Sequence, residues 1–205
     1  MNRAELKANA KQQIKGNIGI LFAIALLAIA IIFAVNLIPI VGTLALALVI
    51  SPALSLALIT IYLNLTKGIK PQIADLFNQF NSFWPAFKAT FFVGLFTMLW
   101  SLLLYIPGII KALSYSMTMY ILAEDPTKPA LQAIRESKEM MHGHKADLFV
   151  LYLSFFGWIL LGYLTLGLLY IWLVPYMETT LANFYNSIKP QYVSDAPSYS
   201  AAYEE

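Results

Sequence analysis

The chain has 205 residues, of which 60% are hydrophobic and only 12% are charged, and its formal net charge is +2 at pH 7. Soluble domains carry about 25% charged residues, and a soluble chain this apolar would expose large patches and aggregate. The small net charge gives no support for a nucleic-acid partner, and the absence of cysteine excludes disulfides and thiolate chemistry. We therefore expect an all-α polytopic membrane protein that has the lipid bilayer as its main partner.

Residues 2–15 are expected to form an amphipathic helix at the cytoplasmic surface of the membrane. One stripe of this helix is basic and recurs every four residues, with Arg3, Lys7, Lys11 and Lys15. A neighbouring stripe is apolar, with Leu6, Ala10 and Ile14. Such a helix lies at the interface with its cations toward anionic lipid headgroups. The alternative is a frayed cytoplasmic terminus whose charges only set the topology.

Six membrane-spanning helices are expected, arranged as three hairpins in a single domain over residues 1–188. A bilayer core about 30 Å thick needs about 20 apolar helical residues, and two apolar runs are too long for one crossing. Pro107-Gly108 is interpreted as the tip between the third and fourth spans, and Thr165-Leu166-Gly167 as the break between the fifth and sixth. The predicted spans cover about 18–38, 43–65, 89–106, 109–123, 148–163 and 168–185.

Polar segments separate the hairpins, and two of them are expected to be further interfacial helices. Residues 72–84 place Ile73, Leu76, Phe77 and Phe80 on one face, and residues 130–141 place Leu131, Ile134, Ser137 and Met141 on one side. An amphipathic segment before each hairpin suggests three repeats around an axis normal to the membrane. The alternative is that any protein built from short-looped hairpins has this appearance. Residues 189–205 are expected to be a disordered cytoplasmic tail.

The distribution of cations supports six spans with both termini in the cytoplasm. With this topology the outer turns hold no charge, and every one of the 13 Lys and Arg residues except Lys111 lies on the inner side. An excess of Lys and Arg in cytoplasmic segments is the usual determinant of membrane orientation. A five-span alternative would split the basic segments across the membrane.

The chain resembles a known family of small multi-pass bacterial integral membrane proteins, the domain-of-unknown-function family 975. The resemblance extends over nearly the whole chain and is carried by the following stretches: NRAELKANAKQQIKGN (2–17), IPGIIKALSYS (106–116), YILAEDP (120–126), MHGHK (141–145), FGW (156–158), VPY (174–176) and ANFY (182–185). It implies a plasma-membrane protein, mostly of Gram-positive bacteria, and it implies no activity.

Three polar residues within the predicted spans are candidates for a functional site. Glu178 follows Pro175 in the sixth span, and Asn183 lies one turn further on. A carboxylate at membrane depth is expected to face the bundle interior or a wet cavity, where it could serve a proton- or cation-coupled site. Lys111 lies four residues beyond Pro107, at the second outer tip, and can reach the outer surface as an anchor.

No convergent set of catalytic or metal-ligating residues is apparent, so we expect no enzyme activity, cofactor or metal. His142 and His144 with Asp147 are too few ligands for a closed metal site. Two functions remain. The first is a non-enzymatic membrane scaffold or interaction module, with a partner protein or a second copy of the chain. The second is a small transporter or channel-like permease, with a polar cavity lined by Glu178, Asn183, Ser51 or Ser114.

Overall fold

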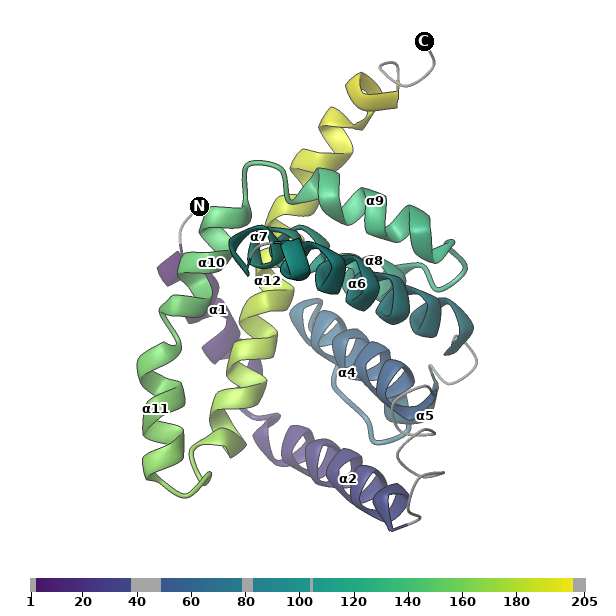
Figure 1. Cartoon of the computed structure of the whole chain (residues 1–205). Helices are drawn as coiled ribbons and strands as arrows, with labels where there is room; N and C mark the ends of the chain where they lie inside the picture. Colours follow the sequence, from purple (N-terminus) through teal and green to yellow (C-terminus); the bar gives the residue numbers. More distant parts are fainter. Residues whose placement is uncertain (1–2, 38–48, 79–82, 104, 201–205) are drawn as a thin grey trace.

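The computed structural model describes residues 3–37, 49–78, 83–103 and 105–200 of the chain. Within these ranges every regular element is a helix, and short turns join most of them, as Figure 1 shows. The prediction of an all-α protein is therefore confirmed for the described residues.

Helix α12 (Tyr170–Ser200) runs through the middle of the molecule, and α1 (Arg3–Ile14) and α4 (Ser51–Thr66) pack along it (Figure 1). α1 contributes its predicted apolar stripe to the core, because Leu6, Ala10 and Ile14 are all buried. Burying a side chain such as Leu or Ile contributes about 1.5–3 kcal/mol. This stripe therefore docks α1 on the protein itself, and contact of α1 with the membrane surface stays a prediction.

The first predicted hairpin is described in part. α2 (Ile18–Asn36) ends close to the predicted boundary at residue 38, whereas the predicted tip, Pro39–Gly42, lies outside the described residues. α4 is 16 residues long, and the start predicted at residue 43 lies outside the described residues. Pro52 stands in its first turn, where proline is tolerated because the backbone N–H has no helical partner there.

The second hairpin consists of α6 (Phe83–Leu103) and α7 (Tyr105–Tyr115), which lie side by side. α6 begins six residues before the predicted Ala89, and Pro107 and Gly108, the predicted tip, both lie inside α7. Pro107 is accommodated in the first turn of α7, so it does not end a helix. A Cβ at Gly108 would lie 2.9 Å from the Cα of Ser101, so glycine is what lets these two helices approach.

The predicted fourth span is divided into α7 and α8 (Thr118–Glu124), and a side chain from another helix fills the break. Ser137 of α9 (Ala130–Met140) is fully buried there. Its hydroxyl donates to the carbonyl of Ser114 at 2.9 Å and accepts from the backbone N–H of Met117 at 3.1 Å. Backbone groups freed by the break are thus satisfied within the protein, as a buried chain requires.

The predicted interfacial helices differ from the observed elements. Among its described residues, the segment 72–84 holds the four-residue α5 (Asp75–Asn78) and the first two residues of α6, and Phe80 lies outside the described residues. α9 forms nearly as predicted, but its buried face consists of Ala130, Ala133, Ile134, Ser137 and Met140. Leu131, expected on that face, is 55% exposed, because the helix turns its small residues toward the neighbouring helices instead.

The predicted fifth span forms two helices, α10 (Lys145–Leu153) and α11 (Phe156–Leu164). The break expected at Thr165-Leu166-Gly167 is present, and Leu166 and Gly167 have positive φ angles of 50° and 89°. Glycine adopts this conformation without steric cost, which explains the turn. α12 then continues to Ser200, into the segment expected to be disordered, because its buried part from Leu173 to Ile188 anchors a helix that extends beyond it.

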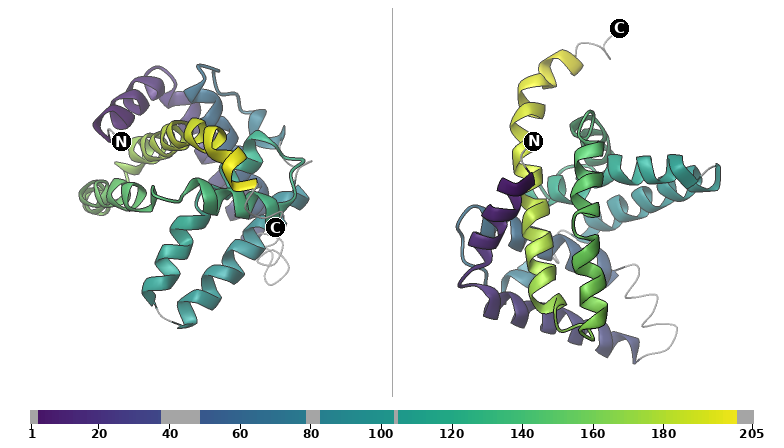
Figure 2. Two further views of the ribbon diagram at one scale, coloured as in Figure 1. Left: turned by 90° about the horizontal axis from the view of Figure 1, so that it is seen from above. Right: turned by 90° about the vertical axis from the view of Figure 1, so that its left-hand side faces the viewer.

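The helix pairs point in different directions. In Figure 2 the α6–α7 pair reaches sideways from α12, whereas α11 runs alongside the N-terminal half of α12. The three segments expected to be equivalent also differ in helix length: α1 and α9 have 12 and 11 residues, whereas α5 has four. The described residues therefore show no threefold arrangement of parallel hairpins.

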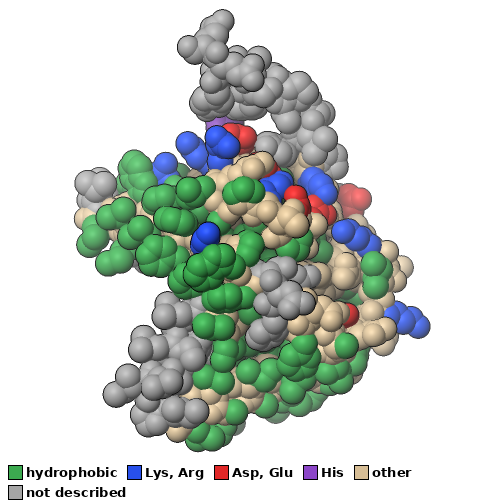
Figure 3. Space-filling view, turned by 90° about the vertical axis from the view of Figure 1, so that its right-hand side faces the viewer, with side chains coloured by type: hydrophobic (Ala, Val, Ile, Leu, Met, Phe, Trp, Pro, Cys, Tyr) green, Lys and Arg blue, Asp and Glu red, His purple; other side chains and the backbone are tan. Residues whose placement is uncertain are grey.

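Four helical stretches are long and apolar enough to cross a membrane: Ile18–Asn36, Phe83–Leu102, Ile106–Glu124 and Lys145–Leu164. α4 is apolar but shorter, and α12 is not among the four. On the face in Figure 3, hydrophobic side chains cover much of the described surface, and charged side chains gather mainly toward the end where α12 projects. Apolar surface of this extent is typical of a protein that lies in a bilayer.

Candidate functional site

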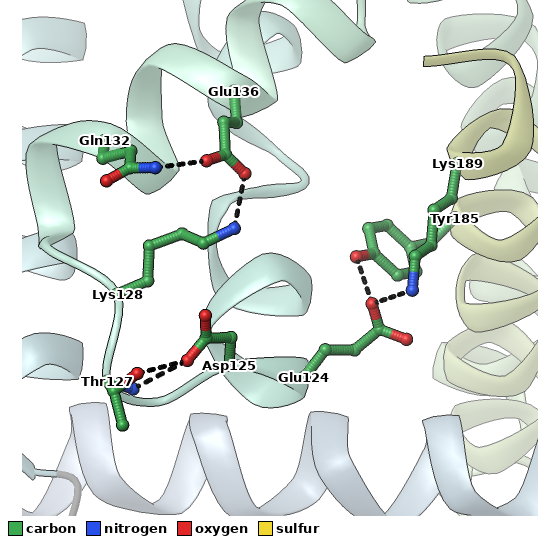
Figure 4. A network of polar contacts seen from close by, with 8 residues as sticks. All are labelled: Glu124, Asp125, Thr127, Lys128, Gln132, Glu136, Tyr185 and Lys189. Carbon is green, nitrogen blue, oxygen red and sulfur yellow. Dashed lines mark hydrogen bonds and ion pairs between the residues drawn. The ribbon is translucent and has the colours of Figure 1, made fainter. Parts of the chain in front are cut away.

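The densest polar cluster in the described chain is centred on Glu124, the last residue of α8. Its carboxylate accepts hydrogen bonds from the Tyr185 hydroxyl at 2.8 Å and from Lys189 Nζ at 2.5 Å (Figure 4). Lys67 Nζ, just after α4, lies 3.5 Å from the other oxygen. Only 17% of the Glu124 side chain is exposed, so these contacts connect α4, α8 and α12 in a largely dry setting.

A second cluster faces the first across a small cavity. Glu136 on α9 accepts from Lys128 Nζ at 2.7 Å and from the Gln132 amide at 2.9 Å (Figure 4). Asp125 accepts from both the backbone N–H and the hydroxyl of Thr127, at 3.1 and 2.6 Å. The hydroxyl of Thr127 thereby holds the pKa of the Asp125 carboxyl below its ordinary value, which keeps this carboxylate ionised at neutral pH.

The cavity between the two clusters has a volume of about 350 Å³. Its lining is largely charged and consists of Ile121, Glu124, Asp125, Lys128, Glu136, Met140, Tyr185 and Lys189. Each of its carboxylates already has a hydrogen-bonding partner in the protein. Among the described residues no group of three or more His, Cys, Asp or Glu side chains could hold a metal ion. The arrangement is that of a network that fastens helices together at one end of the molecule.

Asn183, a predicted site residue, joins α12 to α1 through side-chain hydrogen bonds. Its amide N–H donates to Gln13 Oε1 at 2.7 Å, and Gln13 Nε2 donates back to Asn183 Oδ1 at 3.3 Å. Asn183 is 9% exposed, so this reciprocal pair is shielded from solvent. One helical turn further along α12, Asn186 donates to the hydroxyl of Thr66 on α4 at 2.7 Å.

Glu178, the second predicted site residue, lies partly buried on α12. It interacts electrostatically with the phenols of Tyr62, Tyr120 and Tyr152, which come from α4, α8 and α10. Glu178 therefore lies where several helices converge, and it lines neither the 350 Å³ cavity nor the groove described below.

Lys111, the third predicted site residue, lies on α7 with its Nζ 4.4 Å from the centre of the Trp100 ring on α6. This is a cation–π contact across the second hairpin. The partners of Lys111, Glu178 and Asn183 differ, so the structure does not combine the three into one site.

The predicted headgroup-binding residues of α1 divide into two kinds. Arg3, Lys11 and Lys15 are exposed. Lys7 instead donates to the carbonyl of Ser154 at 3.3 Å and lies 4.1 Å from the centre of the Phe155 ring, at the break between α10 and α11. Desolvation there, and then the nearby charge of Arg3, lower the pKa of Lys7.

The Glu124 cluster is the part of the site that the sequence did not indicate. Glu124 and Asp125 precede Pro126 and therefore suggested only a turn. Tyr185 and Lys189 are four residues apart and share one face of α12, a spacing that places two donors together. That spacing could have identified the donors, but nothing in it named Glu124, 61 residues earlier, as the acceptor.

The sequence matches the family described as "Protein of unknown function (DUF975)" over residues 1–112 and 102–191. The chain therefore belongs to this family, as the resemblance predicted. No curated protein and no solved structure matches the chain.

Proposed function

We propose that this member of the DUF975 family is a multi-pass protein of the bacterial plasma membrane that acts as a non-enzymatic scaffold or interaction module. The observation that supports this most is that its polar side chains are satisfied within the protein: Glu124 and Asn183 by other side chains, and Ser137 by backbone groups. Large apolar side chains face outward instead, including Phe33, Leu102, Phe156 and Leu164. Such a molecule presents its surroundings with an apolar surface, where lipid or a partner protein can gather.

In this proposal the chain crosses the membrane six times, with both termini in the cytoplasm of a Gram-positive bacterium. α4 and the apolar first part of α12 supply the two crossings beyond the four long apolar helices. α4 is short, and short spans are accommodated by local thinning of the bilayer at a modest energetic cost. The outer turn at Leu166, which is 96% exposed, carries no charge, as the orientation requires.

A transporter is the second candidate, and one observation favours it. The Glu178 carboxylate is partly buried, it interacts electrostatically with three tyrosine phenols, and none of the described residues forms a hydrogen bond or ion pair with it. Ionisable groups in such surroundings are typical of proton and ion pathways.

Flux through reconstituted vesicles separates the two functions. The purified chain is placed in proteoliposomes with a trapped pH-sensitive dye, and proton flux is followed after a pH jump and with a panel of solutes outside. The scaffold predicts no flux above protein-free vesicles. A flux that Glu178→Gln abolishes, and that the matched change Asp75→Asn in α5 leaves intact, would replace the scaffold with the transporter.

A further inference from the structure

A groove of about 520 Å³ lies where the start of α6 meets the loop before α9. Its lining combines aromatic, apolar and basic side chains: Trp84, Pro85, Lys88, Phe92, Thr127, Lys128, Pro129, Ala130 and Leu131. We call it the Trp84 groove. It is separate from the lining of the charged 350 Å³ cavity except at Lys128, which borders both.

Lys88 and Lys128 are the charged residues that line the Trp84 groove. Lys88 is exposed, and its Nζ lies 5.4 Å from the centre of the Trp84 ring. Lys128 also lines the groove, but its Nζ is paired with Glu136, which lines the charged cavity and not the groove. No carboxylate lines the groove itself, and the first turn of α9 beside it holds no acidic residue. Lys128 is balanced by Glu136 and lies near Asp125, whereas Lys88 forms no ion pair with the described residues. An anion in the groove would therefore meet the charge of Lys88 first.

An apolar track leads away from the groove along α6. The Trp84 and Phe87 rings are stacked with centroids 5.6 Å apart, and Phe87 and Phe91 follow at 6.2 Å. Phe91 and Met98 are 54% and 61% exposed. Because Phe83–Leu102 is one of the four stretches able to cross a membrane, this track lies on a surface that lipid chains would cover. A lysine at the end of an apolar surface complements an amphiphile that has an anionic headgroup and an apolar chain.

We propose that the Trp84 groove binds one anionic glycerophospholipid, with its phosphate between Lys88 and Lys128 and an acyl chain along the exposed face of α6. Trp84 lies at the level of the headgroup, where tryptophan is enriched in membrane proteins. This inference rests on the proposed membrane location and gives the scaffold a lipid of defined charge as its partner. It does not depend on whether Glu178 conducts protons.

Trp84 itself provides the test. A reporter chain carrying Trp100→Phe, Trp158→Phe and Trp172→Phe keeps Trp84 as its single tryptophan. It is reconstituted in vesicles that contain brominated phosphatidylglycerol or, separately, brominated phosphatidylcholine, because bromine quenches a neighbouring indole. We expect stronger quenching by phosphatidylglycerol at equal mole fraction. Since a lysine near an anionic surface contributes about 1 kcal/mol, Lys88→Gln should reduce the preference about fivefold.

The matched control is Lys70→Gln, an exposed lysine before α5 that carries the same charge change outside the groove. It should leave the preference unchanged. Equal quenching by the two lipids, or equal losses for the two lysine variants, would overturn the proposal. Abolition of the preference by millimolar soluble glycerol phosphate would show that the groove takes a soluble phosphoester, which also overturns it.

Native mass spectrometry of the unmodified chain gives a second measurement that needs no tryptophan replacement. We expect one phosphatidylglycerol to be retained by the wild type and lost from Lys88→Gln. The lipid result and the flux result are independent of each other. If the groove binds no phosphatidylglycerol and the vesicles show no flux, the scaffold remains with a protein as its partner. If the vesicles show a flux that depends on Glu178, the scaffold is refuted but the lipid site is not.

Discussion

Glu124 fastens three helices through one carboxylate, and neutralising that carboxylate tests whether the cluster stabilises the fold. Glu124→Gln keeps the shape of the side chain and removes the charge that Lys189 and Lys67 face. Hydrogen bonds to charged groups contribute about 1.5–3 kcal/mol and neutral ones about 0.5–1.5 kcal/mol. The two lysines are 41% and 49% exposed, so solvent weakens their share. We expect Glu124→Gln to lower the free energy of unfolding by about 1–2 kcal/mol.

A double-mutant cycle isolates the shared contact. Tyr185→Phe removes one hydroxyl donor and should cost about 1 kcal/mol. Both changes act on the same hydrogen bond, which Glu124→Gln weakens by removing the charge and Tyr185→Phe removes. The double variant should therefore lose about 0.5–1 kcal/mol less than the two single losses added together. Denaturant unfolding in detergent micelles, followed by circular dichroism, measures all three variants.

The salt dependence and a matched control make the test specific. At 1 M salt the Debye length is about 3 Å, so the loss from Glu124→Gln should shrink while the loss from Tyr185→Phe stays constant. Asp75→Asn makes the same charge change at a carboxylate whose hydrogen bonds, within the described residues, come from Gln72 and Asn78 of its own turn. Strictly additive losses, or a loss from Glu124→Gln no greater than from Asp75→Asn, would refute the stabilising role of the cluster.

The remaining predictions concern helix contacts, and the same unfolding measurement checks them. Ser137→Ala should cost about 1–3 kcal/mol, because a buried backbone N–H loses its acceptor; a loss below 0.5 kcal/mol would contradict this. Gly108→Ala should cost about 1–3 kcal/mol, because the new methyl group meets the backbone of Ser101, and an unchanged midpoint would count against the close approach. Asn183→Leu should cost about 1–3 kcal/mol by leaving the Gln13 amide unpaired, and Gln13→Leu in the same chain should restore part of that loss.

Local features of this fold were predictable from the sequence because they depend on neighbouring residues. The turn at Thr165–Gly167 follows from a glycine between two apolar runs. The basic and apolar stripes of α1 follow from a four-residue spacing. The two ends of α2 follow from a long apolar run that polar residues flank. In each case the physical cause lies within a few residues of the feature.

Contacts between distant segments explain where the structure differs from the predictions made from the sequence. Pro107 suggested a hairpin tip, but the first turn of α7 tolerates proline, so Pro107 lies inside that helix. Glu178 and Asn183 suggested one intramembrane site, but the Asn183 side chain is hydrogen-bonded to Gln13, 170 residues away. The central position of α12 depends on how its buried polar residues match α1, α4 and α8, and no periodicity within α12 encodes those partners.

Membrane topology is tested most directly by accessibility in intact cells, because the chain has no cysteine and any introduced thiol is the only one present. Arg135→Cys places a thiol on an exposed position of α9, and Leu166→Cys places one at the exposed outer turn. A maleimide that cannot cross lipid should label residue 166 from outside and reach residue 135 only after the cells are opened. Labelling of residue 135 in intact cells would contradict the proposed orientation, and with it the membrane arrangement on which the scaffold depends.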